Sequence, residues 1–169
     1  MDSKVKELLN QQVTKELYSS YLYLAFANYY NDNNLDGYEH WFRIQAQEEV
    51  EHAFKFIKYL QDNGEKVTLG AIDAPVDSFT SFRDPLVAAF EHEKYVTSLI
   101  HDIYDAARKV EDFRCCQFLE WFIAEQCEEE KNAKELVDRY DLFADSRGLY
   151  LLNAELKARP HKPLDFAIL

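Results

Sequence analysis

The sequence predicts an all-α protein in which four long helices form a bundle and a short fifth helix follows. Only 4 Gly and 4 Pro occur in 169 residues, which favours long helices over a turn-rich β architecture. Four long stretches carry apolar residues in steps of three or four, as one face of a helix does. Residues 64–83 separate the second stretch from the third and show no sustained helical period.

The first two helices are expected at about residues 3–31 and 37–63. Residues 31–34 are Asn-Asp-Asn-Asn, which suit the end of a helix, and Gly64 stands where the second helix should stop. The predicted buried faces are Val5, Leu9, Val13, Glu16, Ser20, Leu24 and Ala27 in the first helix and Phe42, Ala46, Glu49, Ala53, Phe56 and Leu60 in the second.

The connection over residues 64–83 is unusually long for a compact domain. About 20 residues can run the length of a bundle, so this crossover lets the second and third helices lie parallel. The third helix should open at Asp84-Pro85, a capping residue followed by proline in the first turn. Its predicted buried face is Leu86, Phe90, Glu93, Thr97, Ile100, Tyr104 and Ala107.

The fourth helix is expected at about 112–140, and a short fifth helix at about 149–157, between Gly148 and Pro160. The predicted buried face of the fourth is Phe118, Phe122, Gln126, Glu129, Ala133 and Leu136. We expect residues 1–158 to form one domain, and residues 159–169 to form a C-terminal tail to which the sequence assigns no role.

Charge and cysteine content restrict the partners and the compartment. The net charge of −12 argues against nucleic acid or an anionic membrane as a partner, and it is compatible with attracting cations. Three cysteines, two of them adjacent, make a poor disulfide framework and fit a reducing cytosol. The first residues lack the apolar core of a signal peptide, and no 18 apolar residues run together. We therefore expect a cytoplasmic protein.

Each of the four predicted buried faces has one carboxylate where a hydrophobic residue should be: Glu16, Glu49, Glu93 and Glu129. A buried carboxylate is unfavourable unless something positive neutralises it. Any one of these acids alone would be read as solvated, and a buried salt bridge needs a Lys or Arg that these faces lack. The acids lie roughly 9 to 17 residues from the helix starts, near mid-height of a bundle. Their conjunction predicts a metal site.

The residue types indicate which metal. Glu49 and His52 stand at i and i+3, so both can reach one ion, and Gln126 precedes Glu129 by three residues. A set rich in oxygen with one imidazole suits iron or a hard divalent cation, whereas thiolates would favour zinc or clusters. Glu49 and Glu93 could each bridge two metal ions if the four helices meet at their midpoints.

Two further features have alternative readings. Tyr23 follows Glu16 by seven residues, so it could contact the site or donate an electron, or it could be a core tyrosine. The cluster Glu125, Glu128, Glu129 and Glu130 is either an ordinary solvated acidic face or, together with Glu48, a place for a further cation.

At these residues the chain resembles the bacterial non-haem ferritins, and the matching segments run in the same order from residue 16 to residue 150. The segments are Glu16-Leu17-Tyr18-Ser19-Ser20, Ala46-Gln47-Glu48-Glu49-Val50-Glu51-His52, His92-Glu93, Glu125-Gln126-Cys127-Glu128-Glu129-Glu130-Lys131 and Gly148-Leu149-Tyr150. Each segment is short, but their combination is specific.

The resemblance implies a ferritin-like four-helix bundle with a fifth helix, assembled as a homo-oligomeric hollow shell of 24 subunits. It implies a ferroxidase that oxidises Fe(II) with O2 or H2O2 at a di-iron centre and stores the ferric oxyhydroxide mineral. By position, it assigns Glu16, Glu49 and His52 to the first iron, Glu49, Glu93 and Glu129 to the second with Gln126 close by, and Glu48, Glu125, Glu128 and Glu129 to a third, with Tyr23 beside the centre.

Differences between this sequence and the patterns of related families narrow the choice within the ferritin superfamily. Bacterioferritins have a second Glu-x-x-His, but Asn132 stands three residues after Glu129. They also bind haem through a Met after the bridging Glu; here that residue is Val50, so no haem is expected. The rubrerythrin Cys-x-x-Cys is absent, and mini-ferritins lack the C-terminal helix predicted here.

Two alternatives to an iron-storage ferroxidase stay open at this point. One is a di-iron peroxidase or oxygenase of the ferritin superfamily that acts on another substrate and forms no storage shell. The other is a structural helical bundle without metal. Gel filtration and an aerobic Fe(II) oxidation assay distinguish the three.

Overall fold

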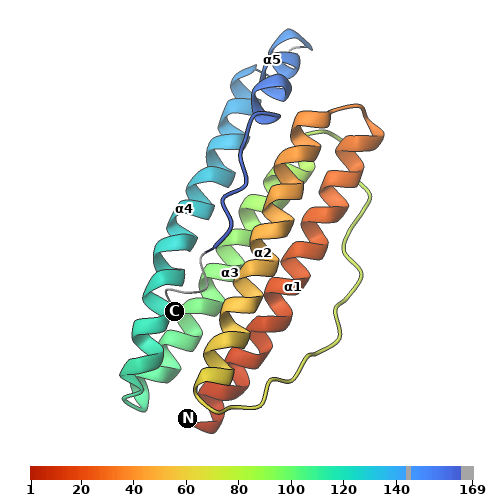
Figure 1. The fold of residues 1–169 in the computed structure, drawn as a ribbon. Helices are drawn as coiled ribbons and strands as arrows, with labels where there is room; N and C mark the ends of the chain where they lie inside the picture. The colour runs from red at the N-terminus through yellow and green to blue at the C-terminus, as the bar shows by residue number, and fades with distance from the viewer. Residues whose placement is uncertain (144–145, 165–169) are drawn as a thin grey trace.

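A computed structural model describes residues 1–143 and 146–164, and within them it contains five helices and no strand. The helices are α1 (Ser3–Asp32), α2 (Asp36–Asp62), α3 (Asp84–Lys109), α4 (Phe113–Phe143) and α5 (Ser146–Leu156). The first four lie side by side as an elongated bundle, and α5 lies at one end of it (Figure 1). The predicted fold class is confirmed.

The long crossover runs the length of the bundle along α1, so α2 and α3 point the same way, as predicted (Figure 1). Two side chains of α1 accept hydrogen bonds from the backbone of this crossover. The amide of Thr68 donates to Asn10 Oδ1 at 2.6 Å, and the amide of Gly70 donates to Thr14 Oγ1 at 3.1 Å. The crossover forms no helix or strand that would pair its backbone groups, so these bonds give two of its amides a partner.

The start of α3 differs from the prediction in one respect. Pro85 stands in the first turn as expected, but the Asp84 carboxylate does not cap its own helix. It instead accepts hydrogen bonds from the backbone amides and hydroxyls of Thr80 and Ser81. Asp84 therefore closes the turn that leads into α3, and these four donors lower its pKa to about 2.

The fifth helix begins three residues earlier than predicted, at Ser146, so Gly148 lies inside it. A Cβ atom at residue 148 would stand 2.1 Å from the backbone oxygen of Phe143. Gly148 thus permits a close approach to the end of α4 and does not precede the helix as a stop. Gly37 serves similarly at the other contact of α5, since its Cβ would stand 1.7 Å from the Asn153 backbone oxygen.

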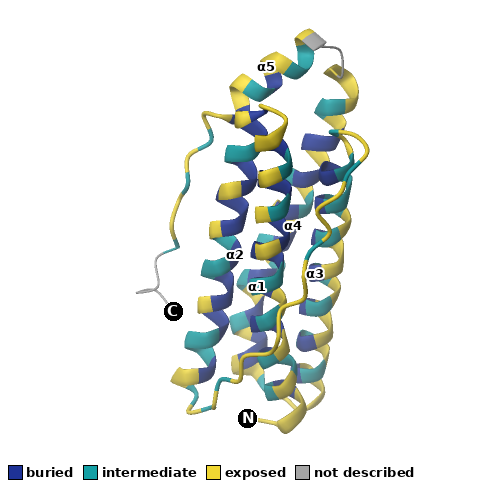
Figure 2. Ribbon diagram, turned by 90° about the vertical axis from the view of Figure 1, so that its right-hand side faces the viewer, coloured by how far each residue is buried: buried dark blue, intermediate teal, exposed yellow. Residues whose placement is uncertain are grey.

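The buried faces point inward along the whole bundle (Figure 2), but the apolar core is divided into two clusters. One cluster lies toward α5, and its aromatic members include Tyr30 stacked on Phe42 at 5.6 Å between ring centroids. The other lies toward the opposite end and includes Phe56 stacked on Phe122 at 4.1 Å. Buried polar side chains occupy the level between them.

No helix in the described part of the chain is long and apolar enough to cross a bilayer. The three cysteines are free; Cys115 and Cys116 are buried, and Cys127 is exposed.

Candidate metal centre

The level between the two apolar clusters holds one buried carboxylate from each long helix. Glu16, Glu49, Glu93 and Glu129 are 1%, 2%, 2% and 4% exposed, and His52 is 2% exposed. Among the described residues, no Lys or Arg forms an ion pair with any of these four acids. The sequence placed these acids in buried faces at one height, and the structure brings them together there.

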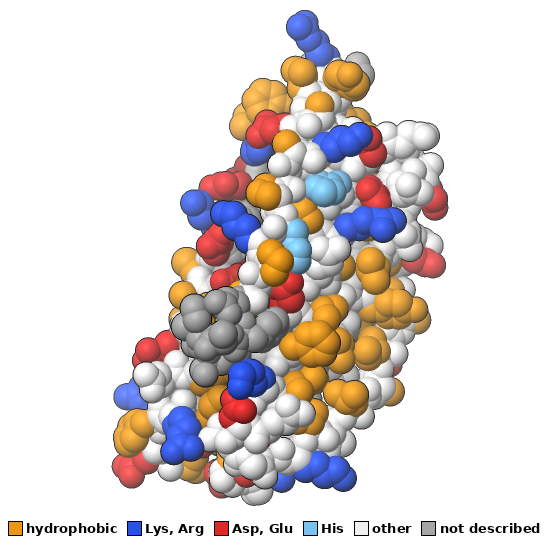
Figure 3. All heavy atoms as spheres, viewed as in Figure 1, with side chains coloured by type: hydrophobic (Ala, Val, Ile, Leu, Met, Phe, Trp, Pro, Cys, Tyr) orange, Lys and Arg blue, Asp and Glu red, His pale blue; other side chains and the backbone are white. Residues whose placement is uncertain are grey.

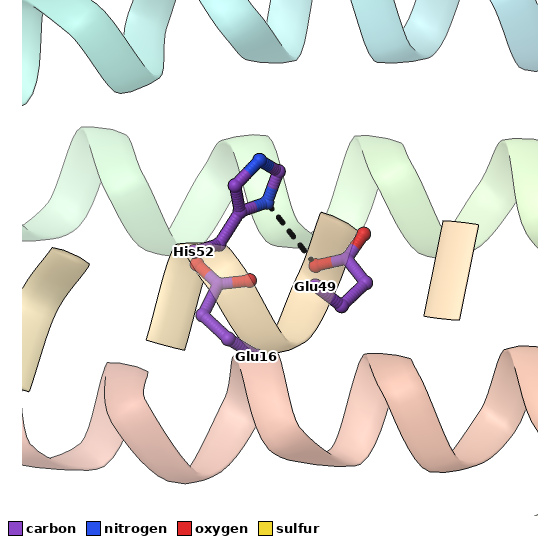
Figure 4. A group of neighbouring side chains, drawn as sticks. All are labelled: Glu16, Glu49 and His52. Carbon is purple, nitrogen blue, oxygen red and sulfur yellow. Dashed lines mark ion pairs between the residues drawn. The ribbon is translucent and has the colours of Figure 1, made fainter. Parts of the chain in front are cut away.

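Glu16, Glu49 and His52 form the tightest group. One ligand atom from each lies within 4.8 Å of the other two, with Glu16 extending from α1 toward Glu49 and His52 of α2 (Figure 4). His52 Nδ1 lies 3.4 Å from Glu49 Oε2. Glu16 Oε2 is buried with no hydrogen-bond partner. An orphaned carboxylate oxygen facing a second carboxylate and an imidazole fits a divalent cation, which would supply the missing partner.

Glu93 lies on the opposite side of the group and is held by two donors. The Tyr23 hydroxyl donates to Glu93 Oε1, and Gln126 Nε2 donates to Glu93 Oε2 at 3.0 Å. Gln126 also reaches the backbone oxygen of Glu93 at 3.3 Å. The sequence placed Tyr23 and Gln126 next to the centre, and both contact it through Glu93.

Two glutamines that the sequence analysis missed hold the other acids. Gln12 Nε2 donates to Glu16 Oε1 at 2.9 Å, and Gln45 Nε2 donates to Glu129 Oε2 at 2.8 Å. Both glutamines are buried, at 2% and 1% exposure. The pattern contained a signal for them, because each stands four residues before a predicted ligand on the same helix face.

Comparison with known proteins places this arrangement in a family. Residues 6–143 match the family model described as a ferritin-like domain. The chain belongs to the ferritin family. It is similar to the bacterial non-heme ferritin of Campylobacter jejuni, with 33% identity over 158 residues that cover 93% of this chain and 95% of the relative. A probable bacterial non-heme ferritin-like protein of Haemophilus influenzae is 31% identical over 157 residues, covering 92% and 95%.

Solved ferritins share the whole fold. An open-pore ferritin from Archaeoglobus fulgidus superposes with a TM-score of 0.93 and 37% identity, covering 95% of this chain and 98% of that one. An engineered closed form of the A. fulgidus ferritin gives a TM-score of 0.94 and 36% identity, covering 96% and 99%. The resemblance stated from the sequence is confirmed, and the family supports a role in iron storage.

The electrostatics of this ferritin's acidic layer follow from burial. Desolvation raises the pKa of Glu16, Glu49 and Glu93, and it raises that of Glu129 to about 8, with the Glu93 charge adding to the effect. Burial alone would lower the pKa of His52, but the carboxylates around it overcome burial and raise it. Without a metal ion the layer therefore retains protons, and a cation that binds there displaces them.

The buried face of α1 includes Tyr23 but excludes a neighbouring residue that was predicted to be buried. Leu24 was predicted to be buried, but it is 39% exposed, whereas Tyr23 is 1% exposed. One residue is about 100° of helix rotation, so the buried face of α1 passes over Tyr23, which bonds Glu93. Burial and the Glu93 charge raise the pKa of Tyr23 well above its usual value, so it keeps its proton.

The predicted third-iron residues are less closely gathered than the central group. Glu48 forms an ion pair with Arg159 at 2.7 Å, and Glu125 Oε1 lies 3.8 Å from His52 Nε2. Glu128 is exposed. Within the described ranges, Glu16, Glu49 and His52 are the residues that meet the geometry of a metal-binding group. Arg159 at Glu48 was not foreseen from the sequence.

Proposed function

We propose that this ferritin is a cytoplasmic ferroxidase and iron store, which oxidises Fe(II) with O2 or peroxide and holds the ferric mineral in a hollow shell of 24 chains. The observation that carries this proposal is the buried layer of four carboxylates and one imidazole, with which no Lys or Arg of the described residues forms an ion pair. Such a layer is unfavourable in an empty bundle and becomes favourable when metal ions enter.

In this proposal Fe(II) is the substrate, and the residues divide into two positions that share a bridge. Glu16, Glu49 and His52 bind the first ion, and Glu49, Glu93 and Glu129 bind the second. Two ions held by a common carboxylate can each give one electron to the same oxidant. The glutamines Gln12, Gln45 and Gln126 fix the carboxylates through their amide hydrogens, so the ligands are oriented before iron arrives.

Protons are part of the same scheme. The raised pKa values of the four acids mean that entry of Fe(II) releases protons from the layer. Tyr23 keeps its proton and donates it in a hydrogen bond to Glu93, which orients that carboxylate. Glu48, Glu125, Glu128 and Glu129 stay proposed ligands of a third ion at the edge of the layer.

The test is aerobic Fe(II) oxidation, followed by the ferric absorbance, on protein sized by gel filtration. Glu49→Ala and His52→Ala should each abolish the fast phase, because each removes a ligand of the first ion. Their controls are Glu91→Ala and His101→Ala, which change an exposed acid and an exposed histidine on α3 and should oxidise Fe(II) at the wild-type rate. Unchanged initial rates in both site variants would refute the ligand assignment.

Gel filtration separates this proposal from the peroxidase or oxygenase alternative. Storage requires an assembly on the order of 24 chains of 19.9 kDa each, in the wild type and in the site variants alike. A monomer or dimer that still oxidises Fe(II) would favour the alternative without a shell.

A further inference from the structure

The C-terminal segment after α5 turns back along the bundle and lies over the outer side of α2 (Figure 1). The segment, residues 157–164, follows the part of α2 that carries the metal centre. Acidic, basic and histidine side chains lie around this segment on the same face of the molecule (Figure 3). Four of its residues, Lys157, Arg159, His161 and Leu164, contact α2 through charged or hydrogen-bonded groups, which makes its position specific.

Arg159 makes the central contact. Its guanidinium donates to Glu48 Oε2 at 2.7 Å and to the Trp41 backbone oxygen at 3.3 Å, and it lies 4.8 Å from the centre of the Trp41 ring. The Arg159 backbone oxygen lies 2.9 Å from His40 Nε2. The side chains of Arg159 and Glu48 are 21% and 20% exposed, so the pair is largely shielded from water. An ion pair that is largely shielded from water and held by several contacts is stronger than an exposed surface pair.

A second anchor lies one turn further along α2, at Glu51. The Leu164 amide donates to Glu51 Oε2 at 2.8 Å, and His161 Nε2 lies 2.9 Å from Glu51 Oε1, out of line for a hydrogen bond. This anchor limits how far Arg159 can move when it leaves Glu48. It thereby keeps the guanidinium at a high effective concentration near that carboxylate.

Glu48 neighbours the ligand Glu49 in the chain, and it is one of the acids proposed for a third ion. A metal ion and a guanidinium cannot both use the same oxygen of Glu48, since both are cations that need its lone pairs. We propose that the C-terminal segment is a lid in which Arg159 takes the place of a cation at Glu48. Docking of the segment and binding of a third ion then exclude each other.

This inference rests on the proposed metal centre and adds a regulatory element to it. Mutual exclusion is a coupling free energy, so it acts in both directions. Loss of Arg159 strengthens binding of the third ion, and saturation with metal releases Arg159 from Glu48 and so weakens the attachment of the segment to α2. Loading of the first position is unaffected, because the contacts of Arg159 within the described residues include neither Glu16 nor His52.

Zinc titration calorimetry on the full-length assembled protein tests the first direction, with Zn²⁺ as a redox-inert probe. Arg159→Ala should tighten the weakest class of zinc sites by about tenfold and leave the tighter class unchanged. Arg159→Lys keeps the charge and should stay close to the wild type. Lys162→Ala is the matched control, because it removes an exposed cation of the same segment; it should leave the titration unaltered.

Hydrogen exchange of residues 157–164 tests the second direction. Saturating Zn²⁺ should speed exchange of the Leu164 amide in the wild type, and Arg159→Ala should speed it without metal. A zinc titration of Arg159→Ala that matches the wild type overturns the inference, as does exchange of the segment that zinc leaves unchanged. Glu49→Ala reports separately on the metal centre: if it keeps the tight zinc class, the proposed function fails, while the comparison at Arg159 stays valid.

Discussion

The buried acids predict an inverted pH dependence of stability in the metal-free protein. Glu129 has a pKa of about 8 in the fold against 4.5 for a free glutamate. Because the folded pKa is the higher one, its contribution is fully present below about pH 4.5 and is lost as the pH rises toward 8. At 1.36 kcal/mol per unit, the full shift is worth about 5 kcal/mol. Metal-free protein should therefore be less stable at pH 8 than at pH 5.

Glu129→Gln removes this ionisation and keeps the side-chain shape. Its amide oxygen can still accept the hydrogen bond from Gln45, as the protonated carboxyl does. The pKa of about 8 already includes the Gln45 hydrogen bond to the ionised form, so at pH 8 the free energy of unfolding of the variant should exceed that of the wild type by about 4 kcal/mol. At pH 5 the two proteins should differ little.

The assay is urea unfolding followed by far-UV circular dichroism, in the presence of a chelator and at one fixed chain concentration. Glu128→Gln is the control, since it makes the same change at the neighbouring exposed position and should follow the wild type at every pH. Equal pH slopes for the wild type and Glu129→Gln would refute the reasoning. Added Zn²⁺ should reverse the slope of the wild type, because metal binding releases protons and improves as the pH rises.

Two further predictions concern packing. Phe56→Ala opens a cavity beside Phe122 in a fully buried stack and should lower the free energy of unfolding by about 3–5 kcal/mol, whereas Phe54→Ala, at a 51% exposed position, should change it by less than about 0.5 kcal/mol in urea unfolding. Gly37→Ala puts a Cβ 1.7 Å from the Asn153 backbone oxygen and should therefore displace α5. Hydrogen exchange should show lost protection in α5 and none lost in α3. Unchanged exchange in α5 would contradict the contact.

Much of this fold could be predicted because helix periodicity encodes which face is buried. Glu16, Glu49, Glu93 and Glu129 repeat with their apolar neighbours at the helical spacing, so their common burial followed from sequence position. The exact edge of a buried face is harder to predict: Leu24 was assigned to the core together with Tyr23, but only Tyr23 is buried.

Contacts between segments distant in sequence were beyond such reasoning. The pairing of Arg159 with Glu48 joins residues 111 positions apart, and nothing in the local pattern of either residue indicates it. The Asp84 side chain could cap its own helix or close the preceding turn, and only the backbone path over 80–83 decides between them. The last five residues, Asp165 to Leu169, lie outside the described residues, so the boundary of a C-terminal tail over 159–169 stays a prediction.

The division of the core into two apolar clusters also sets the alignment of the helices. If α3 slid along its neighbours by one turn, Glu93 would move about 5.4 Å, leave Tyr23 and Gln126, and enter an aromatic cluster. A carboxylate without donors among aromatic rings is strongly unfavourable, while an all-apolar interface would tolerate such a slip. The same holds for α4, because a slip of that helix would take Glu129 away from Gln45 of α2. The buried polar level therefore favours one register of the helices in the bundle, even before any metal is bound.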